Sequence, residues 1–203
     1  MAGTRSHPDS LQPGLGREYS LAEFEALQSE HGNLWELDGG RLVDRHPRDF
    51  NGKISTPNPK HSGLQWRIAA LIDEAGAELG ETFTELTLTL DPATMIVRIP
   101  DVCFASNAFM AAQDDPDELI SGAPELCIEV LSPGDRMQQV EAKADLYFQY
   151  GAREVWIFDP ANRSVQVHGR EPQRIIVFKV SELLTGGPLL PKLSMDLAQL
   201  FDA

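Results

Sequence analysis

The sequence predicts a mixed α/β fold in which a β-sheet is flanked by α-helices. The chain has 203 residues, of which 42% are hydrophobic, and this is enough for one compact domain with a complete core. Segments with helical spacing of apolar residues are interspersed with shorter, strand-like segments, and no internal repeat is apparent. We therefore expect a flexible N-terminal segment over 1–18, followed by a single domain over 19–203.

The first part of this domain is predicted from one capping motif and from patterns of apolar residues. Ser20-Leu-Ala-Glu23 is a capping box, in which a hydroxyl and a carboxylate satisfy backbone N–H groups at a helix start. It predicts a helix that ends near His31. The elements expected next are a hairpin over 34–43 turning at Gly39-Gly40, a loop over 46–60 and a long helix over about 62–79.

The second part is predicted to contain most of the strands. Strict alternation over 83–90 predicts one strand, and Asp91-Pro92 is a turn into another over 95–105. After the acidic run 114–118, the apolar segment 126–131 predicts a third strand. The elements expected next are a turn and helix cap at 132–135, a helix to about 150, strands over 154–158, 164–168 and 174–180, and a short helix over 197–201.

Two of these apolar segments each contain one carboxylate. The segment 95–105 contains Asp101, and the segment 126–131 contains Glu129. A carboxylate in a buried strand costs several kcal/mol unless something compensates it. If the strands are neighbours, the two carboxylates can converge on one divalent cation, and oxygen ligands suit Mg²⁺ or Mn²⁺.

Lys143 follows Glu129 on the next predicted helix, in one stripe with Gln139 and Tyr147. Its ammonium would orient or deprotonate a water that attacks a phosphate, and would stabilise the charge that builds on the phosphate. Two acids and a lysine favour metal-assisted phosphodiester hydrolysis. A structural interpretation is equally open, because an Asp after a proline can cap its own backbone and a Glu–Lys pair can be purely structural.

The charge distribution is atypical of a nucleic-acid-binding protein but suits a cation site. The formal net charge is −14, the opposite of most nucleic-acid-binding proteins. Residues 61–130 hold most of this excess, with 2 basic against 13 acidic residues, or −11, and such a region suits a cation site. The best candidate for a DNA-facing surface, with a solvated loop as the alternative, is the basic set Arg41, Arg45, Arg48, Lys53 and Lys60.

Targeting signals are not apparent in the sequence. No apolar run reaches 18 residues, so no membrane span is expected. The segment 1–17 lacks the apolar core of a signal peptide, which predicts a cytoplasmic protein. Cys103 and Cys127 are expected to be reduced core residues, because they form no metal-binding or disulfide pattern.

Several short motifs together resemble the Uma-type group of bacterial putative restriction endonucleases, within the PD-(D/E)xK nuclease superfamily. The resemblance covers about 20–201 and implies a restriction-endonuclease-like α/β core with a Mg²⁺-dependent nuclease site for DNA. The motifs that carry it are, in order, Pro100-Asp101, Glu129-Val-Leu-Ser-Pro133, Lys143 with Tyr147, and Gly151-Ala-Arg-Glu-Val-Trp156 with Asp159-Pro160.

The resemblance also implies roles for single residues. Asp101 and Glu129 match the metal-binding acids, and Lys143 matches a catalytic lysine that has moved to a helix, because Leu131 occupies the usual lysine position. Glu36 matches an early family glutamate, either a further metal ligand or a water-orienting group; from the sequence alone it can equally be an exposed hairpin residue.

Two further positions matter to the resemblance. His61 matches a recurrent family histidine, although a residue just before a helix can simply cap it or lie in solvent. Gln139 departs from the family, which often has an aspartate four residues before the helical lysine.

The sequence therefore predicts a Mg²⁺-dependent endonuclease that cleaves DNA. A homodimer is expected, since one small domain has few surfaces with which to hold a duplex. The alternative is a non-catalytic binding or assembly module that keeps the fold, favoured by the net charge, Leu131 and Gln139. A third hypothesis is a metal-dependent hydrolase of small phosphate esters. Mg²⁺-dependent nicking of DNA separates the first hypothesis from the other two.

Overall fold

The computed structural model describes residues 16–45, 59–113, 119–133 and 135–202, and it shows a mixed α/β fold. The elements are, in chain order, α1 (Leu21–His31), β1 (Trp35–Asp38), β2 (Arg41–Asp44), α2 (Pro59–Gly76), β3 (Gly80–Thr84), β4 (Leu88–Asp91), β5 (Ile96–Arg98), β6 (Val102–Ser106), α3 (Asn107–Ala111), β7 (Ile120–Ser121), β8 (Leu126–Val130), α4 (Met137–Gln149), β9 (Glu154–Asp159), β10 (Ser164–Gly169), β11 (Arg174–Lys179), β12 (Leu183–Gly186), β13 (Leu190–Asp196) and α5 (Leu197–Asp202).

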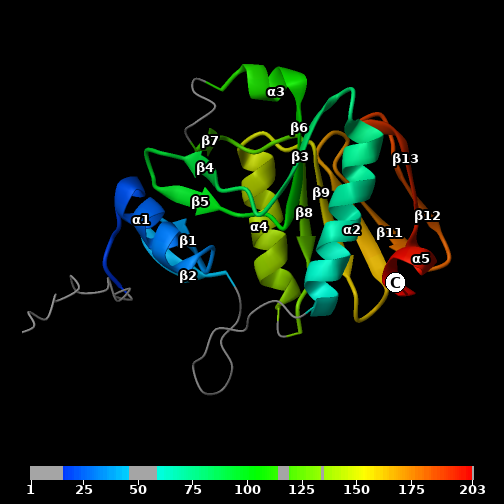
Figure 1. The fold of residues 1–203 in the computed structure, drawn as a ribbon, viewed down its shortest axis with the longest axis horizontal. Helices are drawn as coiled ribbons and strands as arrows, with labels where there is room; N and C mark the ends of the chain where they lie inside the picture. Colours follow the sequence, from blue (N-terminus) through cyan, green and yellow to red (C-terminus); the bar gives the residue numbers. More distant parts are fainter. Residues whose placement is uncertain (1–15, 46–58, 114–118, 134, 203) are drawn as a thin grey trace, which may run out of the picture.

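The strands form two sheets and a separate hairpin. The five-stranded sheet has the order β2-β1-β5-β4-β7, the six-stranded sheet has the order β11-β10-β9-β8-β6-β3, and β12 pairs with β13. Figure 1 shows the five-stranded sheet with α1 on one side of the molecule and the six-stranded sheet, with α2, α5 and β12–β13, on the other. The prediction of a mixed sheet flanked by helices is thus confirmed, with its strands distributed between separate sheets.

Three apolar clusters hold these layers together. One face of the six-stranded sheet packs against α2, α5 and β13, through side chains that include Phe104, Trp156 and Phe158. The other face packs against α4 through Cys127, Ala144 and Tyr147, and β4 joins this cluster. A third cluster lies between α1 and the five-stranded sheet. Burial on both faces explains why all five residues of β8 are buried and why its sequence is an apolar run.

The first helix and the first hairpin follow the predicted pattern. The Ser20 hydroxyl accepts from the backbone N–H of Glu23, and the Glu23 carboxylate accepts from the backbone N–H of Ser20 at 2.9 Å, which is the expected capping box. The hairpin turns at Gly39 and Gly40, whose φ angles of 58° and 74° lie in the left-handed region that glycine adopts without strain. The long helix α2 begins at Pro59 and ends at Gly76.

Two predicted strands are each wrong in the same way, because each is divided between the two sheets. The expected strand over 83–90 separates into β3 of the six-stranded sheet and β4 of the five-stranded sheet, with a left-handed residue, Glu85, between them. The expected strand over 95–105 separates into β5 and β6, so Asp101 lies between strands rather than within one. The two crossings are adjacent, since the backbone N–H of Glu85 donates to the carbonyl of Asp101 at 3.2 Å.

Other predictions need smaller corrections. Asp135 does not cap α4; its carboxylate accepts from the backbone N–H of Ser132 at 2.6 Å, and the N-cap of α4 is Arg136. The segment between β11 and α5, for which no strand was expected, contains the hairpin β12–β13. Among the described residues, no helix combines the length and the apolar character that a bilayer span requires. Most of the predicted N-terminal segment, most of the predicted loop and the acidic run lie outside the described residues, at 1–15, 46–58 and 114–118.

Candidate functional site

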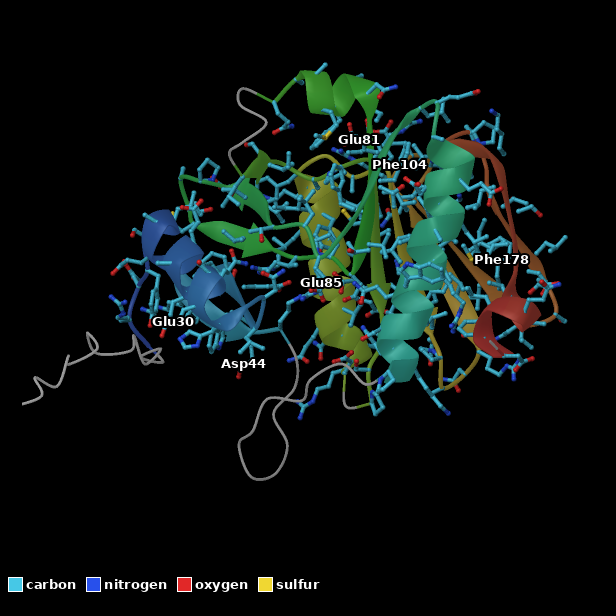
Figure 2. All side chains as sticks on the ribbon, in the orientation of Figure 1. Glu30, Asp44, Glu81, Glu85, Phe104 and Phe178 are labelled. Atoms are coloured by element: carbon cyan, nitrogen blue, oxygen red, sulfur yellow. The ribbon has the colours of Figure 1, made fainter. Side chains whose placement is uncertain are left out.

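The sequence-predicted site residues meet where the chain crosses between the two sheets. Asp101 lies on the crossing between β5 and β6, and Glu129 lies on β8. Glu36 comes from β1, Lys143 from α4 and His61 from the first turn of α2. Elements from both sheets and two helices therefore contribute to one buried polar cluster. Figure 2 labels Glu85, the residue at the adjacent crossing.

Asp101 is 5% exposed, and both of its carboxylate oxygens have partners. Oδ2 accepts from the backbone N–H of Val130 at 2.7 Å, which ties the crossing to β8 next to Glu129. Oδ1 lies 3.2 Å from Nη2 of Arg45 and 3.8 Å from Nε2 of His61. The carbonyl of Asp101 accepts from the side-chain amide of Gln65 at 2.8 Å. α2 thus holds the backbone of Asp101, and β8 holds its carboxylate.

The ammonium of Lys143 bridges two buried carboxylates from different sheets. Nζ lies 2.9 Å from Oε1 of Glu129 and 3.0 Å from Oε1 of Glu36. Oε1 of Glu129 also accepts from the Tyr147 hydroxyl at 2.8 Å, so two members of the predicted helical stripe contact the same carboxylate. Gln139, the third member, is exposed.

Glu36 is 4% exposed, so its interpretation as an exposed hairpin residue is wrong. Its Oε1 accepts from the backbone N–H of Ile99 at 2.9 Å, which connects β1 to the crossing that carries Asp101. Its Oε2 lies 3.8 Å from Nε of Arg98. Glu36 is therefore held by groups of the five-stranded sheet while it binds Lys143 of α4.

Arg45 belongs to the site, although its place in the sequence predicted a DNA-facing or solvated loop. Its side chain is 3% exposed, and Nη1 lies 3.2 Å from Oε1 of Glu85 while Nη2 binds Asp101. Nε donates to the carbonyl of Ile99 at 3.2 Å. The guanidinium therefore joins the two crossings, and Arg45 is removed from the candidate DNA surface. Its position directly after the predicted hairpin gave no sign of this, because an arginine after a strand is usually solvated.

His61 is buried, at 6% exposure, and lies within the first turn of α2, so the interpretation that it caps the helix from just before it or lies in solvent is wrong. Nδ1 lies 3.2 Å from the hydroxyl of Ser132, in the segment after β8. Burial lowers the pKa of the imidazole, but the Asp101 carboxylate near Nε2 outweighs it, and the net result is a raised pKa. His61 thus adds positive charge beside Asp101 more readily than a histidine in water.

The carboxyl groups of the cluster differ in the direction in which their pKa values are shifted. Burial raises the pKa of Glu129 to about 7, with Asp101 and Glu36 adding to the shift and Lys143 opposing it. For Glu36, burial also acts upward, but Lys143 and Arg98 outweigh it and hold the pKa below its usual range. For Asp101, burial is outweighed by His61 and Arg45, and the pKa is again lowered.

Lys143 stays charged in this environment. Burial lowers the pKa of its ammonium, but Glu129 and Glu36 outweigh burial and the net shift is upward. An ammonium cannot accept a proton from water, so at neutral pH Lys143 can orient a water or stabilise negative charge but does not act as a base. Of the roles expected from the sequence, orienting the water and stabilising charge on the phosphate fit a charged Lys143, whereas deprotonating the water does not.

The donor set at the site fits a cation that keeps much of its own water. Among residues 16–45, 59–113, 119–133 and 135–202, no three His, Cys, Asp or Glu side chains are arranged to hold a metal ion. Oε2 of Glu129 accepts no hydrogen bond from the described residues, and the Asp101 carboxylate, which binds the backbone N–H of the next residue, Val130, helps to raise the pKa of Glu129. Mg²⁺ is commonly held by one or two carboxylates together with waters and substrate phosphates. Asp101 and Glu129 therefore suit Mg²⁺ more than an ion that is coordinated by protein ligands alone.

Comparison with known proteins gives matches at the level of family and fold. Residues 21–198 match the model of the Uma2 family, described as putative restriction endonuclease. A crystal structure of a putative nuclease belonging to DUF820 from Anabaena variabilis ATCC 29413 superposes with a TM-score of 0.71 and 22% sequence identity, covering 90% of this chain and 97% of that chain. No match was found among proteins of curated function.

Proposed function

Because the chain belongs to the Uma2 family of putative restriction endonucleases, we propose that it is a Mg²⁺-dependent endonuclease that hydrolyses DNA phosphodiester bonds. The observation that carries the proposal is the cluster in which Asp101 is tied to the residue after Glu129, and Glu129 binds the Lys143 ammonium at 2.9 Å. Two adjacent acids and a lysine are the groups that this chemistry needs.

Each side chain has a distinct role in this proposal. Asp101 and Glu129 would hold Mg²⁺, which when bound supplies polarisation of the phosphate and lowers the pKa of a coordinated water. Lys143 donates a hydrogen bond to the attacking water or to the phosphate oxygen on which charge develops. Glu36 holds the ammonium in place at 3.0 Å, and Tyr147 fixes the Glu129 carboxylate. Glu36 and Tyr147 are therefore positioning residues.

A DNA-cleavage assay tests the proposal. The wild type is incubated with supercoiled plasmid and with single-stranded DNA and RNA, in Mg²⁺, in Mn²⁺ and in EDTA. We expect metal-dependent nicking that Asp101→Asn and Glu129→Gln abolish. Glu78→Gln is the matched control, because Glu78 is an exposed acid that pairs only with Lys192 at 2.7 Å among the described residues. The proposal fails if no polymer is cut with either metal, or if Asp101→Asn cuts as well as the control.

A non-catalytic binding or assembly module is the second candidate, and one observation favours it. Both oxygens of Asp101 are already engaged, Oδ1 by Arg45 and Oδ2 by Val130, as in a structural ion pair. This candidate predicts that DNA binds without cleavage and that Mg²⁺ does not change the binding. Cleavage of nucleotides but not of polymers would instead support the small phosphate-ester hydrolase. The expected homodimer stays a prediction, and analytical ultracentrifugation tests it.

A further inference from the structure

A second polar site lies at the far end of the six-stranded sheet. A pocket of about 360 Å³ is lined there by three arginines, two glutamates and two apolar residues of the β12–β13 turn. The lining residues are Arg153, Glu154, Arg170, Glu171, Arg174, Pro188 and Leu189. The concentration of arginine is notable in a chain with a net charge of −14.

The pocket and the carboxylate cluster belong to opposite faces of the sheet. In the β8–β9 pairing, Glu129 stands opposite Ile157, whereas Glu154 is three residues earlier on β9. Side chains of a strand alternate between faces, so Glu154 points to the face opposite that of Ile157 and Glu129. Three residues also correspond to about 10 Å along a strand. A ligand in this pocket therefore does not touch Asp101 or Glu129.

Arg174 is held in a defined orientation at this pocket. Its Nη2 lies 2.9 Å from Oε1 of Glu154, and the other oxygen of that carboxylate accepts from the Trp156 indole N–H at 2.9 Å. The Arg174 side chain lies over Gly169, where a Cβ would stand 3.1 Å from its Cζ. The glycine thus makes room for the guanidinium, and the buried Glu154 fixes one edge of it.

The other two arginines have charges that the described residues do not neutralise. The backbone N–H of Arg170 donates to the carbonyl of Arg153 at 3.0 Å, which brings the two residues side by side. Both are exposed, and within the described part of the chain neither forms a salt bridge. Since Glu154 is committed to Arg174 and Trp156, only Glu171 is left in the lining to balance Arg153 and Arg170.

We propose that this pocket binds a phosphate group through Arg153, Arg170 and Arg174. The planar guanidinium donates paired N–H groups that match phosphate oxygens, and such charge-assisted hydrogen bonds are stronger than neutral ones. Pro188 and Leu189 form an apolar wall against which a sugar or base attached to the phosphate would pack. Two sources carry this chemistry, a free phosphate or mononucleotide and the backbone of a nucleic acid.

Isothermal titration calorimetry in EDTA at low ionic strength tests the proposal without metal chemistry at the other site. The titrants are inorganic phosphate, a nucleoside 5′-monophosphate and a short oligonucleotide that lacks a terminal phosphate. The variants are Arg153→Gln/Arg170→Gln and Lys179→Gln, the latter a control because Lys179 is exposed, lies at the other end of β11 from Arg174 and does not line the pocket. Circular dichroism checks that both variants fold.

We expect the wild type and Lys179→Gln to bind inorganic phosphate alike and the double variant to bind it at least about tenfold more weakly, as the loss of charge-assisted hydrogen bonds predicts. Binding of the oligonucleotide, reduced in the same variant, identifies the nucleic-acid backbone as the source. Binding of phosphate or mononucleotide alone identifies a free ligand. Absence of phosphate binding, or equal binding by the double variant, overturns the proposal.

Discussion

The backbone N–H of Val130 donates a 2.7 Å hydrogen bond to Oδ2 of Asp101. This bond connects the crossing between the sheets to the central strand β8, at the residue that follows Glu129. Because the donor is backbone, the position of Asp101 relative to β8 does not depend on the side chain of residue 129. Substitutions at the two acids therefore have separable effects on structure.

Asp101→Ala is expected to lower the free energy of unfolding by about 3–5 kcal/mol, because it removes the more buried of the two carboxylates that pair with the buried Arg45 guanidinium. Asp101→Asn keeps an oxygen that accepts from Val130, so its loss should be smaller. Urea denaturation of both variants measures the difference. Equal losses would mean that the hydrogen bond to Val130 contributes little.

Lys143→Met should be strongly destabilising above neutral pH, by about 3–5 kcal/mol, since Glu36 and Glu129 then stay buried without their shared cation. The double variant Lys143→Met/Glu129→Gln removes one of those charges and should recover part of the loss. Denaturation in urea at pH 8 compares the three proteins. A double variant less stable than Lys143→Met contradicts the assignment of Lys143 as the counter-ion.

Binding of Mg²⁺ should strengthen as the pH rises toward 7. Glu129 has a pKa raised to about 7 chiefly by burial, and a metal ligand must lose its proton. Each pH unit below that value should weaken the apparent affinity about tenfold. Titration of Mg²⁺ by calorimetry over this range checks the slope, and Glu129→Gln should show no such dependence. A flat profile in the wild type would place the metal elsewhere.

The raised pKa of Glu129 also affects the stability of the metal-free protein, which it lowers as the pH rises. The folded state binds the Glu129 proton more tightly than the unfolded chain, whose pKa is near 4.5. This contribution to stability is fully present below pH 4.5 and is lost as the pH rises through about 7. Urea denaturation in EDTA should show that the stability advantage of Glu129→Gln over the wild type grows across this window. An unchanged difference contradicts the raised pKa.

Two glycines of α2 should respond oppositely to alanine. A Cβ at Gly76 would lie 2.5 Å from Cε2 of the buried Phe104, so Gly76→Ala is expected to destabilise by about 1–3 kcal/mol. A Cβ at Gly63 meets only the end of the Arg67 side chain, at 3.3 Å, which can move. Gly63→Ala should therefore stabilise by about 0.5–1 kcal/mol, the usual difference in helix propensity. Thermal denaturation of both variants tests the packing of α2.

The elements that the sequence predicted well are those whose signals are local. The capping box at Ser20, the glycine pair at Gly39-Gly40 and the helical spacing after Ser62 all gave helices or turns close to the observed ones. The hairpin β12–β13 was missed, although the Gly186-Gly187-Pro188 turn between apolar residues could have indicated it.

The changes of sheet could not be predicted, because they depend on tertiary pairing. Leu86, Leu88 and Leu90 alternate with polar residues into β4, and this alternation alone does not show that the chain has left the sheet of β3. Pro100 was the one signal that a strand could break there. The predicted site residues Asp101, Glu129, Lys143 and Glu36 lie together, while their roles in catalysis stay predictions.

The site was incompletely predicted because it too depends on contacts between distant parts of the chain. Arg45 and Gln65 were missed because each reaches Asp101 from a distant part of the chain. A basic residue after a hairpin and an amide on a helix are ordinary surface residues in most sequences. Only the three-dimensional arrangement shows that these two are buried and that they bind the crossing.

The bridge from Glu36 on β1 through Lys143 to Glu129 on β8 joins groups carried by different sheets. A local opening that separates the sheets would break the bridge while each sheet keeps its own strands paired. Activity should then disappear at a lower temperature than secondary structure does. The proposed reaction centre therefore stays assembled only while the two sheets remain packed against each other.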